Sequence, residues 1–140
     1  MTRFMLDTNT ISYIARNRSP EARRHFKAAE RQSPVYVSAI SEAEVRYGLA
    51  KRPQARLASE TMGEILDHLT ILPWDSSVAA VYGLLRARNE ALGISVGGLD
   101  MLIAAHALAE DAVLVTSDAA LAKLVGGPAT VNWADDLRPN

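Results

Sequence analysis

Short apolar runs alternate with longer helix-like segments along nearly all of this 140-residue chain. The runs have the length of β-strands and lie at residues 4–6, 35–38, 70–72 and 113–116, with a fifth near 130–133. Strands that alternate with helices are typical of βα units arranged around a parallel sheet. The pattern therefore predicts an α/β fold whose central sheet is mainly parallel and has four to five strands.

The segments between the strands are predicted as helices. Segment 41–50 has Ser41 at the expected N-cap and Glu44 three residues later, which is the spacing of a capping box. Apolar residues at helical intervals mark a helix over residues 76–92, and a nearly continuous apolar run marks a buried helix over 99–109. Further helices are expected at residues 10–17, 20–31, 53–69 and 119–125.

The length of the chain fits one ordinary domain, so we expect a single domain over residues 1–140. The chain has no cysteine, which excludes disulfides and thiolate metal sites and fits a reducing cytoplasm. The apolar run directly before Asp7 is only three residues long, too short for the core of a signal peptide, and no uncharged run approaches the length of a membrane helix. We therefore expect a cytoplasmic protein with no membrane contact.

The net charge of −1 conceals an asymmetry along the chain. Residues 1–60 hold 11 basic and 6 acidic side chains, whereas residues 61–140 hold 4 basic and 10 acidic ones. The charges could form two solvated faces of opposite sign, or the basic residues could form a rim that binds phosphates. The candidates for such a rim are Arg16, Arg18, Arg23, Arg24, Lys27, Arg46, Lys51, Arg52 and Arg56.

Four acidic residues from separate parts of the chain follow predicted strands or begin predicted helices. Asp7 directly follows the first strand, and Asp118 lies between the strand at 113–116 and the next helix. Glu44 falls in the first turn of the helix after the second strand, and Asp100 opens the buried helix. Because the carboxyl ends of parallel strands meet at one edge of the sheet, we expect the four acids to lie near one another.

Each acid also has a purely structural explanation, since an acid at a helix N-terminus caps N–H groups and complements the helix dipole. Two carboxylates about 4 Å apart, however, repel by roughly 4 kcal/mol at an effective dielectric of about 20. A cluster of four therefore needs a cation or raised pKa values. Oxygen ligands in a chain without cysteine suit Mg²⁺ or Mn²⁺.

Neighbouring polar residues are weaker candidates for the site. Glu42 lies two residues from Glu44, so on a helix the two side chains point in different directions and only one can enter the site. His106, on the expected buried helix, is interpreted as a core or interface histidine. His25 and His68 are expected on the surface.

Four blocks of the sequence resemble one known family in order and spacing. The blocks are FMLDTNTI at 4–11, SAISEAEVRYG at 38–48, GGLDMLIAAHA at 97–107 and LVTSD at 114–118, and the resemblance runs on to residues 131–133. They resemble the PIN-domain family and, more narrowly, the VapC-type ribonuclease toxins of bacterial toxin–antitoxin pairs.

The resemblance implies that four acidic residues are catalytic and bind one or two Mg²⁺ or Mn²⁺ ions. These residues are Asp7, Glu44, Asp100 and Asp118. Asp7 and Asp100 would be the principal direct ligands. Thr8, Asn9 and Ser117 fall where the family places polar groups that support these acids. The fourth acid is the least uniform in the family, and Leu121 stands where the family often has an aromatic residue.

The resemblance also implies an α/β/α sandwich, a homodimer, and an endoribonuclease that cleaves structured RNA such as tRNA with a metal-activated water. A small cognate antitoxin would inhibit it by covering the acidic pocket with its C-terminal segment. Three alternatives remain open: a PIN nuclease of RNA processing or DNA outside a toxin pair, a non-catalytic PIN-fold binding module, and a haloacid-dehalogenase-like phosphatase. The phosphatase would need a second acid at the position of Asn9.

Overall fold

The computed structural model describes residues 2–137, and its strands form a five-stranded sheet in which all neighbouring strands are parallel. The sheet order is β3-β2-β1-β4-β5. The strands are β1 (Phe4–Leu6), β2 (Val35–Ser38), β3 (Thr70–Leu72), β4 (Val113–Val115) and β5 (Thr130–Val131). The predicted α/β fold with a parallel sheet is therefore confirmed.

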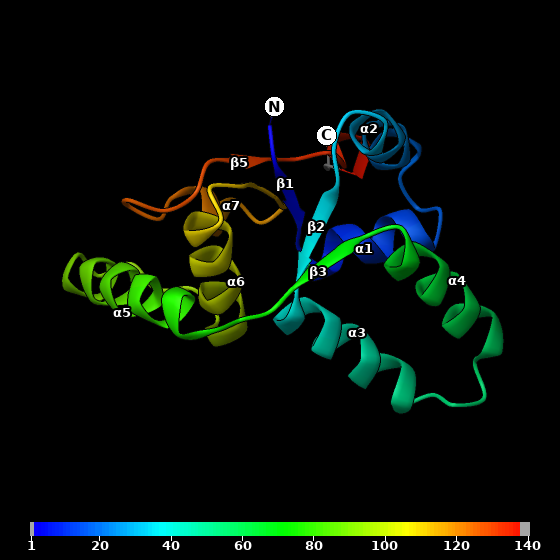
Figure 1. Cartoon of the computed structure of the whole chain (residues 1–140), viewed down its shortest axis with the longest axis horizontal. Coiled ribbons are helices and arrows are strands. Elements are labelled where there is room, and N and C mark those ends of the chain that lie inside the picture. The colour runs from blue at the N-terminus through cyan, green and yellow to red at the C-terminus, as the bar shows by residue number, and fades with distance from the viewer. Residues whose placement is uncertain (1, 138–140) are drawn as a thin grey trace.

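Helices cover both faces of this sheet, and the described residues form a three-layer α/β/α sandwich. Figure 1 shows α1, α2 and α4 on one side of the strands and α5, α6 and α7 on the other. No helix within residues 2–137 has both the length and the apolar character that crossing a bilayer requires. The helices are α1 (Thr8–Ala15), α2 (Pro20–Glu30), α3 (Ala39–Ala50), α4 (Arg56–Asp67), α5 (Ser76–Ala91), α6 (Gly98–Ala109), α7 (Ala119–Ala122) and the short 3₁₀-helix η1 (Asp135–Leu137).

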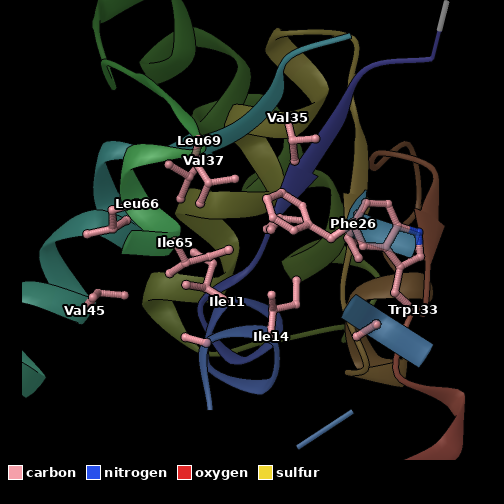
Figure 2. Packing of buried hydrophobic residues seen from close by; sticks show 14 of the residues in the cluster. Ile11, Ile14, Phe26, Val35, Val37, Val45, Ile65, Leu66, Leu69 and Trp133 are labelled. Carbon is pink, nitrogen blue, oxygen red and sulfur yellow. The ribbon is translucent and has the colours of Figure 1, made fainter. Parts of the chain in front are cut away.

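The three central strands, β1, β2 and β4, are largely buried on both faces because successive side chains alternate between two apolar cores. In β1, Met5 packs into the core beneath α5 and α6, whereas Leu6 packs into the core beneath α1, α2 and α4. Figure 2 shows the second core, where Val37 of β2 lies near Ile11 of α1 and Ile65 of α4. Burying each such side chain stabilises the fold by about 1.5–3 kcal/mol, so the cores hold these helices firmly against the sheet.

The order of the strands reverses between β1 and β4, which creates a topological switch point. Strands β2 and β3 lie on one side of β1, and β4 and β5, which come later in the chain, lie on the other side. Asp7, directly after β1, donates its backbone N–H to the carbonyl of Val115 at 3.0 Å and so ties the ends of β1 and β4 together. Ligands of open parallel sheets bind in the crevice at such a point, beyond the carboxyl ends of the strands.

The predicted start of the third helix is wrong. The helix begins at Ala39, and its N-cap is Ser38, whose Oγ accepts a 3.1 Å hydrogen bond from the N–H of Ile40. The predicted N-cap, Ser41, lies buried inside the helix. Because β2 passes straight into α3, the last strand residue also caps the helix, and Glu44 lies in the second turn rather than the first.

Several other ends differ from the predicted ranges. Helix α1 starts at Thr8, two residues before the predicted start, because Asp7 caps it. Helix α4 starts at Arg56 rather than at residue 53, since residues 53 and 54 form a turn. Helix α7 ends at Ala122 rather than at residue 125, shortly before Gly126 adopts a positive φ of 71°. Strands β4 and β5 are also shorter than predicted.

Candidate active site

Asp7 lies at the carboxyl end of β1, buried beneath the edge of the sheet. Its Oδ1 caps helix α1 by accepting a 2.8 Å hydrogen bond from the N–H of Thr10. Burial raises the pKa of Asp7, the hydroxyls of Thr116 and Thr10 oppose this rise, and the charge of Asp118 adds to it. The charged form of Asp7 is thus disfavoured in the folded chain, and a nearby cation would stabilise it.

Asp100 lies half-buried in the first turn of α6. Burial raises its pKa, and the charges of Asp118, Asp7 and Glu44 raise it further. Gly97, the N-cap of α6, leaves room for this carboxylate, since a Cβ at Gly97 would come within 3.3 Å of Asp100 Oδ2. The structure therefore brings Asp118, Asp7 and Glu44 within electrostatic range of Asp100.

Glu44 extends from α3 towards α1, where its Oε1 accepts a 2.7 Å hydrogen bond from the hydroxyl of Thr8. Glu42, two residues earlier, forms a different contact: its carboxylate accepts hydrogen bonds from the guanidinium of Arg46 at 2.9 and 2.8 Å. The two glutamates of α3 therefore point in different directions, and Glu44 is the one that contacts Thr8 and acts on Asp100.

Asp118 is exposed and caps the short helix α7, where its Oδ1 accepts a 2.9 Å hydrogen bond from the N–H of Ala120. The backbone N–H of Asp118 donates to the hydroxyl of Thr116 at 3.0 Å. Thr116 is buried and its hydroxyl also lowers the pKa of Asp7. Helix capping thus accounts for the local conformation of Asp118, and Thr116 connects it to Asp7.

The polar residues that support the acids differ in part from those expected. Thr8 contacts Glu44 as described, and Asn9 lines a groove together with Glu44. Ser117 is exposed, and the buried hydroxyls beside Asp7 belong to Thr10 and Thr116, which sequence reasoning missed. Thr116 ends the predicted strand, so the alternation of strand side chains could have revealed it.

The donors at this edge suit a hard cation by their chemistry. Within residues 2–137, no group of three or more histidine, aspartate or glutamate side chains is placed so that it could hold a metal ion. The available donors are carboxylate oxygens, and burial with mutual repulsion raises the pKa of Asp7 and Asp100. Mg²⁺ is commonly bound by one or two carboxylates while it keeps several waters, which is what an open set of acids can provide.

His106 lies outside this group of acids, in the core, as predicted. Its ring is fully buried, and Nδ1 lies 2.7 Å from the hydroxyl oxygen of Ser38, the N-cap of α3. Burial lowers the pKa of His106, while the charges of Glu110 and Asp75 and the carbonyl of Pro73 oppose this. His106 therefore joins α6, which carries Asp100, to the start of α3, which carries Glu44.

Comparison with known proteins finds one matching family model and several proteins of similar sequence. The family model described as PIN domain matches residues 4–126. The chain is similar to Ribonuclease VapC2 of Rickettsia felis, with 31% identity over 130 residues that cover 93% of this chain and 97% of the relative. It is also similar to the tRNA(fMet)-specific endonuclease VapC of Shigella flexneri, with 28% identity over 134 residues that cover 96% of this chain and 100% of the relative.

The fold is similar to that of solved structures as well. One is the crystal structure of VapBC2 from Rickettsia felis bound to a DNA fragment from their promoter. The TM-score is 0.87 at 27% sequence identity, and the match covers 94% of this chain and 99% of that chain.

Proposed function

The chain belongs to the PIN-domain family, and from this membership we propose that it is the Mg²⁺- or Mn²⁺-dependent endoribonuclease toxin of a type II toxin–antitoxin pair. Its relatives that align with nearly the whole chain carry the names ribonuclease and endonuclease, so the expected enzyme class, a nuclease, is confirmed. The metal, the RNA substrate, the cytoplasmic site of action and the homodimer belong to the proposal.

One observation carries the proposal most strongly. Burial raises the pKa of Asp100 in α6, and three further acids raise it more at the switch point of the parallel sheet: Asp118 of the β4–α7 connection, Asp7 after β1 and Glu44 of α3. Mutual repulsion of this kind costs stability unless a cation or a proton offsets it. Acids that served only as helix caps would have no need to lie near one another.

The proposed chemistry needs no protein nucleophile. Asp7 and Asp100 would be the principal direct ligands of one or two cations, and Glu44 and Asp118 would act directly or through water. A bound divalent cation supplies an activated water near neutral pH and offsets negative charge on the scissile phosphate. The chain itself fixes the donors: Thr10 and the surrounding core hold Asp7, and Thr8 holds Glu44.

The proposed substrate is structured RNA such as tRNA. The Shigella relative is named a tRNA(fMet)-specific endonuclease, which supports tRNA as the first substrate to examine. The proposed inhibitor is a cognate antitoxin. An arginine of such a partner could pair with Asp7 and Asp100 in place of the cation, because a planar guanidinium engages carboxylates through two parallel hydrogen bonds.

The proposal is tested by expressing the chain alone, together with the product of an adjacent antitoxin-like reading frame, and as the Asp100→Asn variant. We expect growth arrest from the chain alone, rescue by the antitoxin, and no arrest with Asp100→Asn. Purified chain should cleave unfractionated bacterial tRNA with Mg²⁺ and not with EDTA. Cleavage without growth arrest would favour a processing nuclease, and a folded chain that binds metal but cleaves no nucleic acid would favour a binding module.

A further inference from the structure

A groove of about 530 Å³ opens beside the acids, between α1, α3 and α4. Thr8 and Glu44 line it, so the groove is continuous with the candidate active site. Figure 1 shows that α3 and α4 are joined by the loop that follows α3, at the end of α3 that lies away from the sheet. Three cationic side chains line the same groove: Arg16, Lys51 and Arg52.

A second groove extends the first one. It has a volume of about 750 Å³, shares Arg16, Ala55 and Ala58 with the first groove, and adds Arg56. The two grooves are adjacent along α1 and α4 because they share these three residues, and together we call them the basic channel. This basic channel is lined by four cations in total, and all four are exposed: Arg16, Lys51, Arg52 and Arg56.

The four cations of the basic channel have no carboxylate partner among the described residues, although the Nζ of Lys51 lies over the ring of Tyr47, 5.2 Å from its centroid. None of them forms an ion pair with a carboxylate of residues 2–137. Other basic residues of the same half are engaged, since Arg24 pairs with Glu21 at 3.9 Å and Arg46 with Glu42 at 2.8 Å. Arg16, Lys51, Arg52 and Arg56 are thus set apart by their place along the two grooves, since other cations of this half, such as Arg31, also form no ion pair within the described part of the chain.

An RNA substrate is a polyanion, so its binding needs cations such as those of the basic channel. Four carboxylates at the sheet edge repel RNA phosphates, so affinity for RNA has to come from cations close to the acids. Arginine and lysine that bind phosphates release counterions from the nucleic acid, which makes the affinity strongly dependent on salt. Asn9, which also lines the first groove, adds a neutral hydrogen-bonding side chain between the acids and the cations.

We infer that the basic channel of Arg16, Lys51, Arg52 and Arg56 binds the RNA phosphates that flank the cleaved bond, on the α1–α4 side of the acids. This inference rests on the proposed ribonuclease function. The RNA strand leaves the acids past Thr8 and Glu44, follows α1 and reaches Arg56 at the start of α4. The unpaired cations favour RNA over a protein occupant, although the first groove also exposes the apolar side chains of Val45, Leu49 and Met62.

The test measures how tightly the full chain binds unfractionated bacterial tRNA at several salt concentrations, with EDTA present to prevent cleavage. The variant is Lys51→Ala combined with Arg52→Ala, both at exposed positions, so the fold should persist. The matched control is Arg31→Ala, an exposed cation just after α2, at the opposite edge of the sheet, where β2 begins. A second control, Lys51→Arg with Arg52→Lys, keeps both charges.

We expect the alanine pair to weaken tRNA binding about tenfold and to lower the slope of log affinity against log salt by about 0.7–0.9 for each lost phosphate contact. Both controls should bind as the wild type does. In cleavage assays with Mg²⁺, KM should rise by a similar factor while kcat stays nearly unchanged, because the lost contacts bind substrate and transition state alike.

Equal effects of the alanine pair and Arg31→Ala on tRNA binding would overturn the inference, while cleavage by the wild type would leave the proposed function standing. Loss of antitoxin binding by the alanine pair, with tRNA binding intact, would overturn it too and assign the groove to the protein partner. A wild type that cleaves no RNA would contradict the proposed function itself, whichever way the binding experiment turned out.

Discussion

The hydroxyl of Thr8 donates a 2.7 Å hydrogen bond to Oε1 of Glu44, and this contact joins the first turn of α1 to the second turn of α3. Thr8 directly follows Asp7, so the residue that holds Glu44 is adjacent in the chain to the most deeply buried acid of the site. The contact fixes Glu44 relative to Asp7 and gives Thr8 a positioning role.

Replacing Thr8 by valine, which has nearly the same shape, should lower kcat/KM for RNA cleavage about 10- to 100-fold, as is usual when a partner of a metal-binding side chain is lost. Thr8→Ser keeps the hydroxyl and should retain most of the activity. Stability should fall by only about 1 kcal/mol, the net value of one hydrogen bond. Kinetics of the two variants at one Mg²⁺ concentration check this, and equal activities for valine and serine would show that the contact has no role.

The two glutamates of α3 should behave differently. Glu42→Gln breaks an exposed ion pair with Arg46, which should cost at most about 0.5 kcal/mol and leave cleavage unchanged. Glu44→Gln should strongly reduce cleavage while the fold persists. Parallel assays of the two variants decide the matter, and a loss for Glu42→Gln as large as that for Glu44→Gln would mean that the wrong glutamate has been assigned.

Asp7→Asn should stabilise the metal-free protein at neutral pH. Burial raises the pKa of Asp7 above its unfolded value of about 3.9, so ionisation costs the folded state more than the unfolded state. That cost is present at neutral pH and disappears as the pH falls below about 3.9. Asparagine also caps helices, so the variant keeps the cap of α1.

Denaturant unfolding in EDTA at pH 7 and pH 4 measures this effect. The gain in the free energy of unfolding for Asp7→Asn should shrink at the lower pH. Asp7→Ala, which relieves the same charge but loses the cap, should be about 1 kcal/mol less stable than Asp7→Asn. If Asp7→Asn unfolds instead, the charged carboxylate itself stabilises the fold, which contradicts this account.

His106 should make the protein less stable in mild acid. Burial lowers its pKa below the unfolded value of about 6.5, so the unfolded chain binds a proton that the folded chain resists. Stability from this residue is complete above about pH 6.5 and is lost as the pH falls towards the folded pKa. Unfolding free energies at pH 7.5 and pH 5.5 should therefore differ less in His106→Gln than in the wild type, and an unchanged difference would contradict this account.

The sequence was sufficient to predict the sheet and the edge where the acids meet, because both follow from patterns of single residues. Strand side chains such as Met5 and Leu6 are apolar on both faces, which is how strands of a covered parallel sheet differ from surface strands. Asp7 follows such a strand immediately, so its place at the carboxyl end of β1 required no knowledge of tertiary contacts.

Details that depend on how neighbouring elements join could not be predicted. Ser38 and Ser41 both precede helix-forming residues, and the spacing of Ser41 to Glu44 imitates a capping box. The structure uses Ser38, because β2 runs into α3 without a loop and His106 contacts the same hydroxyl at 2.7 Å. Thr116 was missed for a related reason, since it is buried just after β4 and its hydroxyl acts on Asp7.

Calorimetric titration of the purified chain with Mn²⁺ and with Mg²⁺ tests the central claim most directly, namely that these carboxylates hold the divalent cation used for RNA cleavage. The account predicts that the wild type and Glu42→Gln bind the metal alike, with a rise in melting temperature as metal is added. Asp7→Asn and Asp100→Asn should lose binding while remaining folded. A wild type that takes up neither ion at millimolar concentration, or an Asp7→Asn variant that binds as well as the wild type, would contradict the claim.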